Sequence, residues 1–295
     1  VAALLSPFRM FIASEKVIFC IAERKIGFAW LTAFSAASFS TFSPWSANEP
    51  SPIVRFNIEK LNADIADGMY FDSSIPQGYG VGSSGALVAA IYSEYAIDPI
   101  NAIDDLTREK LLQLKAIFGR MESFFHGTSS GLDPLNSYLS LPILINSYDN
   151  IEPTGIPTQT PDGKGAVFLL DSGIIGETAP MVHIFMENMK NEAFQKMLKE
   201  EFIKYTDACI DDFLKGRFKS LFGNIKSLSS IVLNHFKPMI PKEFHTLWKQ
   251  GIDTGDYFLK LCGSGGGGYI LGFTEDLEKA KRTLAGHKLE VVYQF

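Results

Sequence analysis

The spacing of apolar residues predicts helices over much of the chain. Between 106 and 121, apolar side chains recur every three to four residues. Asp104 and Asp105 stand at the start of this run, where acidic side chains suit the helix dipole. From Phe194 to Phe213 the same spacing gives one apolar stripe with lysines and glutamates opposite it. Other helices are expected over 59–66, from one of the serines at 83 and 84 to about 95, and over 221–236, 244–259 and 274–286.

Short apolar runs bounded by polar residues or glycine predict strands. Residues 165–171 form the clearest run, and the others are 53–56, 259–261, 269–273 and 289–295. The segment from 150 to 164 is rich in Pro, Thr and Gly, which is typical of a connection between domains. We therefore expect a first domain over 1–160 and a second, with an antiparallel sheet and helices, over 161–295.

Three glycines at alternate positions, Gly78, Gly80 and Gly82, stand before two serines and an apolar helix in the stretch Pro76–Tyr92. Glycine lacks a Cβ and takes positive φ readily, so its backbone can come close to a ligand. A helix that begins at one of the two serines has first N–H groups without intrahelical partners, and these attract an anion. We interpret the stretch as the phosphate-binding loop of a nucleotide-using enzyme.

Two other nucleotide-binding patterns fit this stretch less well. Gly80, Gly82 and Gly85 satisfy the dinucleotide fingerprint G-x-G-x-x-G, but that motif must follow a buried strand. Here the residues from 71 to 76 are polar and end in proline. A Walker loop is excluded because no Gly-Lys-Ser/Thr follows the glycines. A plain glycine-rich turn before a core helix is the alternative when the stretch is taken alone.

A second polar cluster, from Glu122 to Pro134, lies where the helix predicted from 104 ends. Gly127 breaks that helix, and a Ser/Thr/Gly turn presents Asp133 just before a proline. Two carboxylates thus flank a loop of small residues, one suited to a metal ion and the other to a hydroxyl proton. The structural alternative makes Asp133 a helix N-cap and Glu122 a solvated helix residue.

A third cluster lies near the C-terminus, where Gly265–Gly268 are four consecutive glycines between two predicted strands. Each glycine loses more backbone entropy on folding than other residues, so four of them are costly in a plain hairpin. Close approach of the backbone to a ligand explains them, and a flexible loop is the alternative. Cys262, beside the turn, is interpreted as a small buried residue.

Composition is that of an ordinary globular protein. Of 295 residues, 46% are hydrophobic and 20% charged, and the net charge of −6 does not favour nucleic acid or an anionic membrane as a partner. Three widely spaced cysteines without a C-x-x-C pair suit a reduced, cytoplasmic protein without structural zinc or disulfides. Residues 1–52 are atypical: 26–47 lack charge yet are too interrupted by Ser and Thr for a membrane span. They are interpreted either as a buried strand or helix or as a segment outside the fold.

The glycine clusters resemble two motifs of the GHMP kinases (galactokinase, homoserine kinase, mevalonate kinase and phosphomevalonate kinase). Pro76–Ala86 is similar to the second family motif, P-x-x-x-G-L-G-S-S-A-A, with Val81 in place of Leu and Gly85 in place of the first Ala. Cys262–Gly268 is similar to the glycine-rich third motif.

The cluster between them narrows the resemblance. Glu122 and the run from His126 to Asp133 resemble the mevalonate kinase pattern E…H-G-x-P-S-G-x-D, with Ser129 in place of Pro. The Asp-Ser-Gly at 171–173, followed by Thr178, is also similar to the family's first strand and turn after the domain junction. The match extends over about 56–295, and it is specific because the three motifs occur together in order.

The resemblance implies an α+β, two-domain GHMP kinase fold, with an N-terminal ribosomal-protein-S5-like domain and a C-terminal ferredoxin-like domain. It also implies roles for the matched positions. ATP phosphates would be bound by Pro76, Gly78, Gly80, Gly82, Ser83, Ser84, Gly85, Gly263, Ser264, Gly265 and Gly266. Mg²⁺ would be held by Ser84 and Glu122, the substrate would contact His126 and Thr178, and Asp133 would orient or deprotonate the attacking hydroxyl.

The implied activity is transfer of the γ-phosphoryl group of ATP to a small-molecule alcohol. Mevalonate, and hence isoprenoid precursor synthesis, is the first expectation, with phosphomevalonate, a sugar or homoserine as alternatives. The family's first motif, K-x-x-L-x-G-E, has no counterpart in residues 1–52, where Lys16 and Lys25 lack suitable neighbours. No catalytic lysine is therefore assigned, and a catalytically impaired nucleotide-binding relative is a further alternative. A homodimer is one expected assembly; neither nucleic acid nor a membrane is an expected partner.

Overall fold

The computed structural model describes residues 10–11, 17–20, 54–73, 76–101, 106–126, 129–147 and 150–295. These residues divide into two compact units. The N-terminal unit takes in those from Phe11 to Pro76 and from Gly82 to Glu152, and the C-terminal unit takes in Gln77–Val81 and Pro153–Phe295. The glycine-rich stretch is thus divided between the units. Several expected features lie outside the described residues: the strand start at Ile53, the helix start at Asp104 and Asp105, the break at Gly127, and Lys16 and Lys25.

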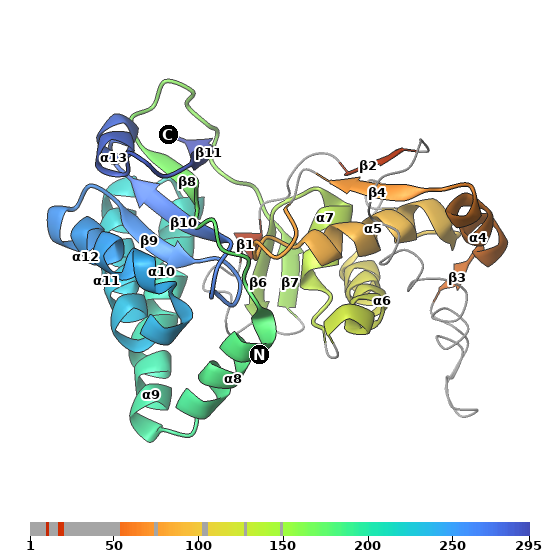
Figure 1. Ribbon diagram of the computed structural model, residues 1–295, viewed down its shortest axis with the longest axis horizontal. Helices are drawn as coiled ribbons and strands as arrows, with labels where there is room; N and C mark the ends of the chain where they lie inside the picture. The colour runs from red at the N-terminus through yellow and green to blue at the C-terminus, as the bar shows by residue number, and fades with distance from the viewer. Residues whose placement is uncertain are drawn as a thin grey trace. The chain divides into compact units, whose positions relative to one another are not determined.

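The N-terminal unit contains both helices and short strands (Figure 1). In chain order they are β1 (Met10–Phe11), β2 (Val17–Cys20), β3 (Arg55–Phe56), α4 (Ile58–Ala66), β4 (Tyr70–Ser73), α5 (Ser83–Tyr95), β5 (Ala96–Ile97), α6 (Arg108–His126), α7 (Leu132–Leu139), β6 (Ile143–Ser147) and β7 (Asn150–Pro153). β2 pairs antiparallel with β4 and β3 with β5, while β6 lies between β1 and β7. The helices predicted over 59–66 and from 83 to 95 are confirmed. The next helix begins only at Arg108, where Thr107 accepts the amide of Lys110 at 3.3 Å.

Helix α5 is the centre of this unit. Every residue from Gly85 to Tyr92 is buried, and the helix packs against α6 and α7. A helix that is apolar on all sides must be surrounded by other elements to be stable in water. The rings of Tyr92, Phe118 and Tyr138 meet edge to face, with centroids 5.0 to 5.5 Å apart. This packing sets the start of α5 relative to α6 and α7, which carry the polar residues discussed below.

The C-terminal unit is built on a four-stranded antiparallel sheet of order β11-β8-β10-β9. Helices α11 and α12 pack against β9, and α10 packs along α11 (Figure 1). The elements are β8 (Ala166–Asp171), α8 (Thr178–Asn188), α9 (Glu192–Met197), α10 (Ile203–Leu214), α11 (Phe218–His235), α12 (His245–Thr254), β9 (Phe258–Leu261), β10 (Tyr269–Thr274), α13 (Leu277–Thr283) and β11 (Leu289–Gln294). The predicted antiparallel sheet is confirmed. A π-helical turn, Leu198–Phe202, joins α9 to α10, so the predicted apolar stripe runs along nearly continuous helix.

Two predicted helix boundaries in this unit are wrong. The helix expected over 244–259 ends at Thr254, because Gly255 takes a left-handed conformation with φ of +74° and β9 begins at Phe258. The last helix does not begin at Thr274, which is the final residue of β10. Its cap is Asp276, which accepts the amide of Lys279 at 2.9 Å.

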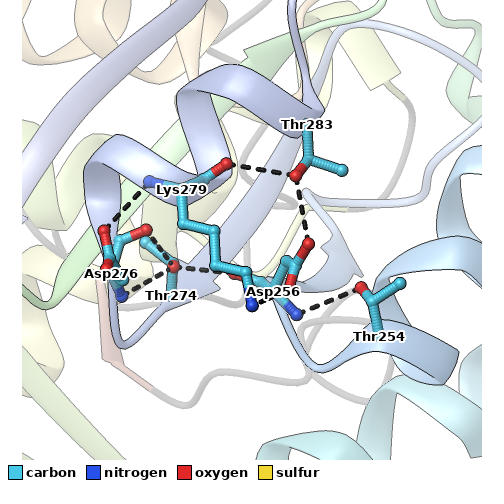
Figure 2. Close-up of polar contacts among 6 residues, drawn as sticks. All are labelled: Thr254, Asp256, Thr274, Asp276, Lys279 and Thr283. Atoms are coloured by element: carbon cyan, nitrogen blue, oxygen red, sulfur yellow. Dashed lines mark hydrogen bonds and ion pairs between the residues drawn. The ribbon is translucent and has the colours of Figure 1, made fainter.

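Figure 2 shows the contacts that Thr274 makes at the end of β10, where it was expected to cap the last helix. Its hydroxyl donates to the carbonyl of Asp256 at 2.8 Å. The Asp256 carboxylate forms an ion pair with Lys279 at 2.7 Å and accepts a hydrogen bond from Thr283 at 3.0 Å. Lys279 lowers the pKa of Asp256 as a result. These contacts fasten the turn before β9 to α13 and keep the edge of the sheet in place.

In the part of the chain that the structure describes, no helix has the length and apolarity needed to cross a membrane.

Candidate functional site

The start of α5 has the geometry that the glycine-rich stretch predicts. Gly82 is the N-cap, with φ of +84° in the left-handed region, and no side-chain hydrogen bond caps the helix. The amide of Ala86 bonds back to the carbonyl of Gly82 at 2.9 Å. The amides before it are not needed by the helix itself, and they lie at the positive end of its dipole. This end of α5 is therefore suited to an anion.

Glu122 places a carboxylate beside this helix start. It lies in the last turns of α6 and is only 4% exposed. The hydroxyl of Ser84 donates to its Oε1 at 3.1 Å, and the hydroxyl of Ser129 donates to its Oε2 at 2.5 Å. Burial raises the pKa of Glu122, and the two hydroxyl hydrogen bonds oppose that shift. The alternative interpretation of Glu122 as a solvated helix residue is wrong.

Asp133 packs on the same turn of α5. It is the second residue of α7, whose N-cap is Gly131, so it is neither the N-cap nor part of the preceding turn. A Cβ added to Gly82 would lie 3.4 Å from the Cβ of Asp133, and one added to Gly85 would lie 2.7 Å from its carbonyl carbon. Gly85 therefore explains one departure from the family pattern. The alanine expected there would push α7, and Asp133 with it, away from α5.

The first part of the glycine-rich stretch is held by backbone hydrogen bonds within the C-terminal unit. The amide of Gly176 donates to the carbonyl of Gly78 at 2.9 Å, and the amide of Tyr269 donates to the carbonyl of Tyr79 at 3.1 Å. The amide of Gly268 donates to the carbonyl of Ile174 at 2.6 Å. Three segments, 77–81, 172–176 and 262–268, are thereby joined, and we call them the loop cluster.

Glycine is required in the loop cluster where two backbones meet. A Cβ on Gly268 would lie 2.4 Å from the Cα of Tyr79, closer than any real contact allows. One on Gly80 would lie 3.1 Å from the carbonyl oxygen of Cys262. Between these glycines, the ring of Tyr79 packs edge-on against Tyr269 with centroids 5.0 Å apart. The glycines predicted from two distant motifs are therefore in direct contact.

The side chain of Tyr79 adds a polar contact to this backbone packing. Its phenol lies close enough to the carboxylate of Asp171, the last residue of β8, to interact with its charge. Partial desolvation, and then the nearby charge of Asp171, raise the pKa of Tyr79. The sequence offered one signal for this residue, an aromatic side chain between two glycines, but assigned it no role.

The strand that leads into the third motif carries a buried amine. Lys260 on β9 is 3% exposed, and its amino group donates to the carbonyl of Leu261 at 2.8 Å. Burial lowers its pKa to about 8. Cys262, expected to be a small buried residue, is half-buried as a residue, and burial of its thiol raises the pKa to about 11. That thiol is therefore a poor nucleophile near neutral pH.

Some of the predicted site residues lie together in the N-terminal unit, and others belong to the C-terminal unit. Ser84, Glu122 and Asp133 all adjoin the first turn of α5 in the N-terminal unit. Gly263–Gly266 belong to the C-terminal unit. His126 is the last residue of α6, and Thr178 is the exposed first residue of α8. The sequence assigned no role to Ser129, although its place where the family pattern has Pro was the available signal.

The part of the chain that contains Ser84, Glu122 and Asp133 is similar to a known family. Residues 53–140 match the family model described as GHMP kinases N terminal domain. That segment contains α5, α6 and α7 up to its C-terminal end, and hence Ser84, Glu122 and Asp133. No curated protein is similar enough to this chain to count as a match.

Several solved structures are similar to about three quarters of the chain. One is the L. major mevalonate kinase in complex with R-mevalonate, 17% identical with a TM-score of 0.53, covering 77% of this chain and 69% of that one. The Streptococcus pneumoniae phosphomevalonate kinase in complex with phosphomevalonate and AMPPNP is 13% identical with a TM-score of 0.52, covering 73% and 70%. The Lactococcus lactis galactokinase complexed with galactose is 13% identical with a TM-score of 0.51, covering 77% and 69%. The chain therefore has the α+β, two-domain fold of the GHMP kinases, as the sequence predicted.

Proposed function

We propose that this protein is an ATP-dependent kinase that transfers the γ-phosphoryl group to the hydroxyl of a small molecule. One observation carries the proposal. The start of α5, suited to an anion, has a buried carboxylate bonded to its second residue, Ser84, and a further carboxylate, Asp133, packed on the same turn. Phosphoryl transfer needs an anion site, a charge-neutralising group and a group that handles the hydroxyl proton, and this turn supplies a candidate for each.

The nucleotide phosphates are assigned to backbone amides. In the N-terminal unit these are the first amides of α5, from Ser83 to Gly85, which a phosphate can use as hydrogen-bond donors. Gly78 and Gly80, the adjoining Pro76, and Gly263–Gly266 are assigned to the nucleotide by resemblance to the family motifs. Amides fixed by surrounding structure hold a phosphoryl group in line for attack and compensate its charge without rearranging during the reaction.

Asp133 is assigned to the substrate hydroxyl. The hydroxyl oxygen forms a bond to the γ-phosphorus while the bond from that phosphorus to the β–γ bridging oxygen breaks, and ADP leaves. The proton of the hydroxyl passes to the Asp133 carboxylate, or is oriented by it. The close packing of α7 on Gly82 and Gly85 holds this carboxylate at one position beside the start of α5.

Mg²⁺ fits the donors at Ser84 and Glu122. Both provide oxygen, the ligand type that Mg²⁺ prefers, and a single carboxylate leaves coordination positions for phosphate oxygens and water. Among the described residues no group of three or more His, Cys, Asp or Glu could hold a metal, so a closed protein cage is not expected. When bound, Mg²⁺ supplies neutralisation of the phosphate charge. Glu122 would be the protein's anionic ligand, with Ser84 beside it.

Mevalonate is the substrate that we propose first. The support is the resemblance of Glu122 and the segment from His126 to Asp133 to the mevalonate kinase motif. His126 and Thr178 are proposed to contact the substrate on the same basis. The fold neighbours named above include proteins complexed with mevalonate, phosphomevalonate and galactose, so the fold by itself does not choose among small alcohols.

A coupled assay of ADP release tests the function. Purified protein is supplied with ATP, Mg²⁺ and, separately, mevalonate, phosphomevalonate, homoserine and galactose, and product phosphorylation is confirmed by mass spectrometry. We expect ATP-dependent phosphorylation of mevalonate. Turnover of another alcohol instead of mevalonate would replace the substrate and retain the kinase. ATP binding by calorimetry without transfer to any of the alcohols would identify a non-catalytic nucleotide-binding relative.

A further inference from the structure

The carboxylate of Glu122 is held at both of its oxygens, and the second contact comes from a residue without an assigned role. Ser84 donates to Oε1 at 3.1 Å and Ser129 donates to Oε2 at 2.5 Å. A carboxylate bonded through one oxygen can still rotate about its terminal torsion, which has a broad energy profile. Hydrogen bonds to both oxygens restrict that rotation. Donation to the ionised form also offsets part of the cost of burying a charge.

Ser129 is itself fixed on the surface of α6. Its amide donates to the hydroxyl of Ser123 at 3.1 Å, and its own hydroxyl accepts the amide of Gly131 at 3.1 Å. The Ser123 hydroxyl in turn donates to the carbonyl of Gly119 at 2.6 Å. The Ser129 oxygen accepts the amide hydrogen of Gly131 on one side, and the hydroxyl hydrogen of Ser129 points to the Glu122 carboxylate on another. The orientation of this hydroxyl is thus determined by its neighbours.

We propose that Ser129 is a positioning residue that holds the Glu122 carboxylate in the orientation required at the phosphoryl-transfer site. This inference rests on the proposed function, because it concerns the same carboxylate. Proline, which the family pattern has at this position, carries no hydroxyl and cannot make the contact. Ser129 is therefore a polar anchor that the family pattern lacks, and it acts through Glu122 without touching the reacting atoms.

Metal dependence gives the direct test. The variant Ser129→Ala removes the anchor. Ser130→Ala is the matched control, because the Ser130 hydroxyl lies in the same loop and bonds to the amide of Leu132, not to Glu122. Ser129→Thr retains the hydroxyl and serves as the conservative variant. We measure the Mg²⁺ concentration for half-maximal activity and, independently of turnover, the binding of Mn²⁺ with AMPPNP by electron paramagnetic resonance.

For Ser129→Ala we expect metal binding weaker by about 10-fold, the size typical of losing a group that orients a ligand, with a smaller change in kcat at saturating metal. Ser130→Ala should change metal binding by less than about twofold, and Ser129→Thr should remain near the wild-type value. Unchanged metal binding in Ser129→Ala would overturn the proposal. So would an equal loss in Ser130→Ala, since that result would assign the effect to loosening of the loop.

A cycle of unfolding measurements separates this inference from the kinase assignment. Urea midpoints are compared for wild type, Ser129→Ala, Glu122→Met and the double variant, all without nucleotide or metal. We expect the Ser129→Ala shift to shrink to less than half in the Glu122→Met background, because the partner is then absent. Additive shifts would exclude the contact. Coupled shifts with weakened Mn²⁺ binding, but no phosphorylation of any alcohol, would reject the kinase function and leave the role of Ser129 intact.

Discussion

The loop cluster of the C-terminal unit and the carboxylate cluster of the N-terminal unit (Ser84, Glu122, Ser129 and Asp133) are held by different kinds of contact. Backbone amides and carbonyls join the segments of the loop cluster, and glycine allows their chains to meet. In the carboxylate cluster, hydroxyls of side chains donate to a buried carboxylate. The loop cluster should therefore be destabilised by a methyl group added where two backbones meet. The carboxylate cluster should instead be impaired by loss of a single hydroxyl or carboxylate, even when the side-chain volume changes little.

Removal of the Asp133 carboxylate should have the largest effect. Asp133→Ala keeps the Cβ that packs against Gly82 and Gly85, so α7 should stay in place. We expect kcat to fall by about 1,000-fold, within the range for loss of a general base, with little change in ATP affinity. Steady-state kinetics and calorimetry with AMPPNP measure the two quantities. Unaltered turnover would remove Asp133 from the mechanism, and an equal loss of ATP affinity would indicate a structural role.

An added methyl group should damage the loop cluster next most severely. Gly268→Ala would place a Cβ 2.4 Å from the Cα of Tyr79, at a residue with φ of +71°. We expect a loss of about 3 kcal/mol in the free energy of unfolding, from overpacking together with left-handed strain. Gly255→Ala is the control, because its φ of +74° imposes similar strain with no atom within 4 Å of the added Cβ. Equal losses in urea unfolding of the two variants would contradict the importance of close approach.

The buried amine of Lys260, on the strand that leads into the loop cluster, should make stability depend on pH. Burial gives Lys260 a pKa of about 8 in the folded protein, against its ordinary value of 10.5. Between these values the unfolded chain binds a proton at Lys260 that the folded chain does not, so stability from this residue rises as pH rises from 8 to 10.5. Over this range the free energy of unfolding increases by about 3 kcal/mol on account of Lys260. Below pH 8 the protein has none of this gain.

The thiols of Cys209 and Cys262 lie near Lys260 and are present in both the wild type and Lys260→Met. A comparison of these two proteins therefore isolates the contribution of Lys260. Urea unfolding of both at pH 7.5, 9 and 10.5 should show the wild type gaining on the variant as pH rises. A constant difference in the free energy of unfolding across this range would mean that Lys260 keeps its ordinary pKa in the folded protein.

The smallest expected effect concerns the phenol of Tyr79 in the loop cluster, which interacts with Asp171. Tyr79→Phe removes the contact with Asp171 but retains the ring that packs on Tyr269. Loss of this one polar contact should raise KM for ATP by about threefold without changing kcat. Tyr79→Ala, which also removes the ring, should raise KM further. A Phe variant as impaired as the Ala variant would show that the hydroxyl, and not the packing of the ring on Tyr269, holds the loop.

Local patterns were a good guide to the elements but a weaker guide to their ends. The apolar stripe from Phe194 to Phe213 predicted helix correctly, because burial of one face produces a periodic pattern. The end of α12 and the start of α13 were displaced because Gly255 and Asp276 took the capping roles. Capping depends on which neighbouring group is closest in the fold, as the bond from Thr274 to Asp256 illustrates.

The sequence by itself determined the elements, the glycine motifs and the family that they resemble, because these follow from local spacing and residue type. Only the tertiary structure decided that Glu122 is buried, that Ser129 and Ser84 bond to its two oxygens, and that Asp133 lies in a helix packed against Gly85. Ser84 and Glu122 are 38 positions apart in the chain. Contacts between such distant residues arise from the packing of α5 against α6 and α7, which the local spacing of either residue does not encode.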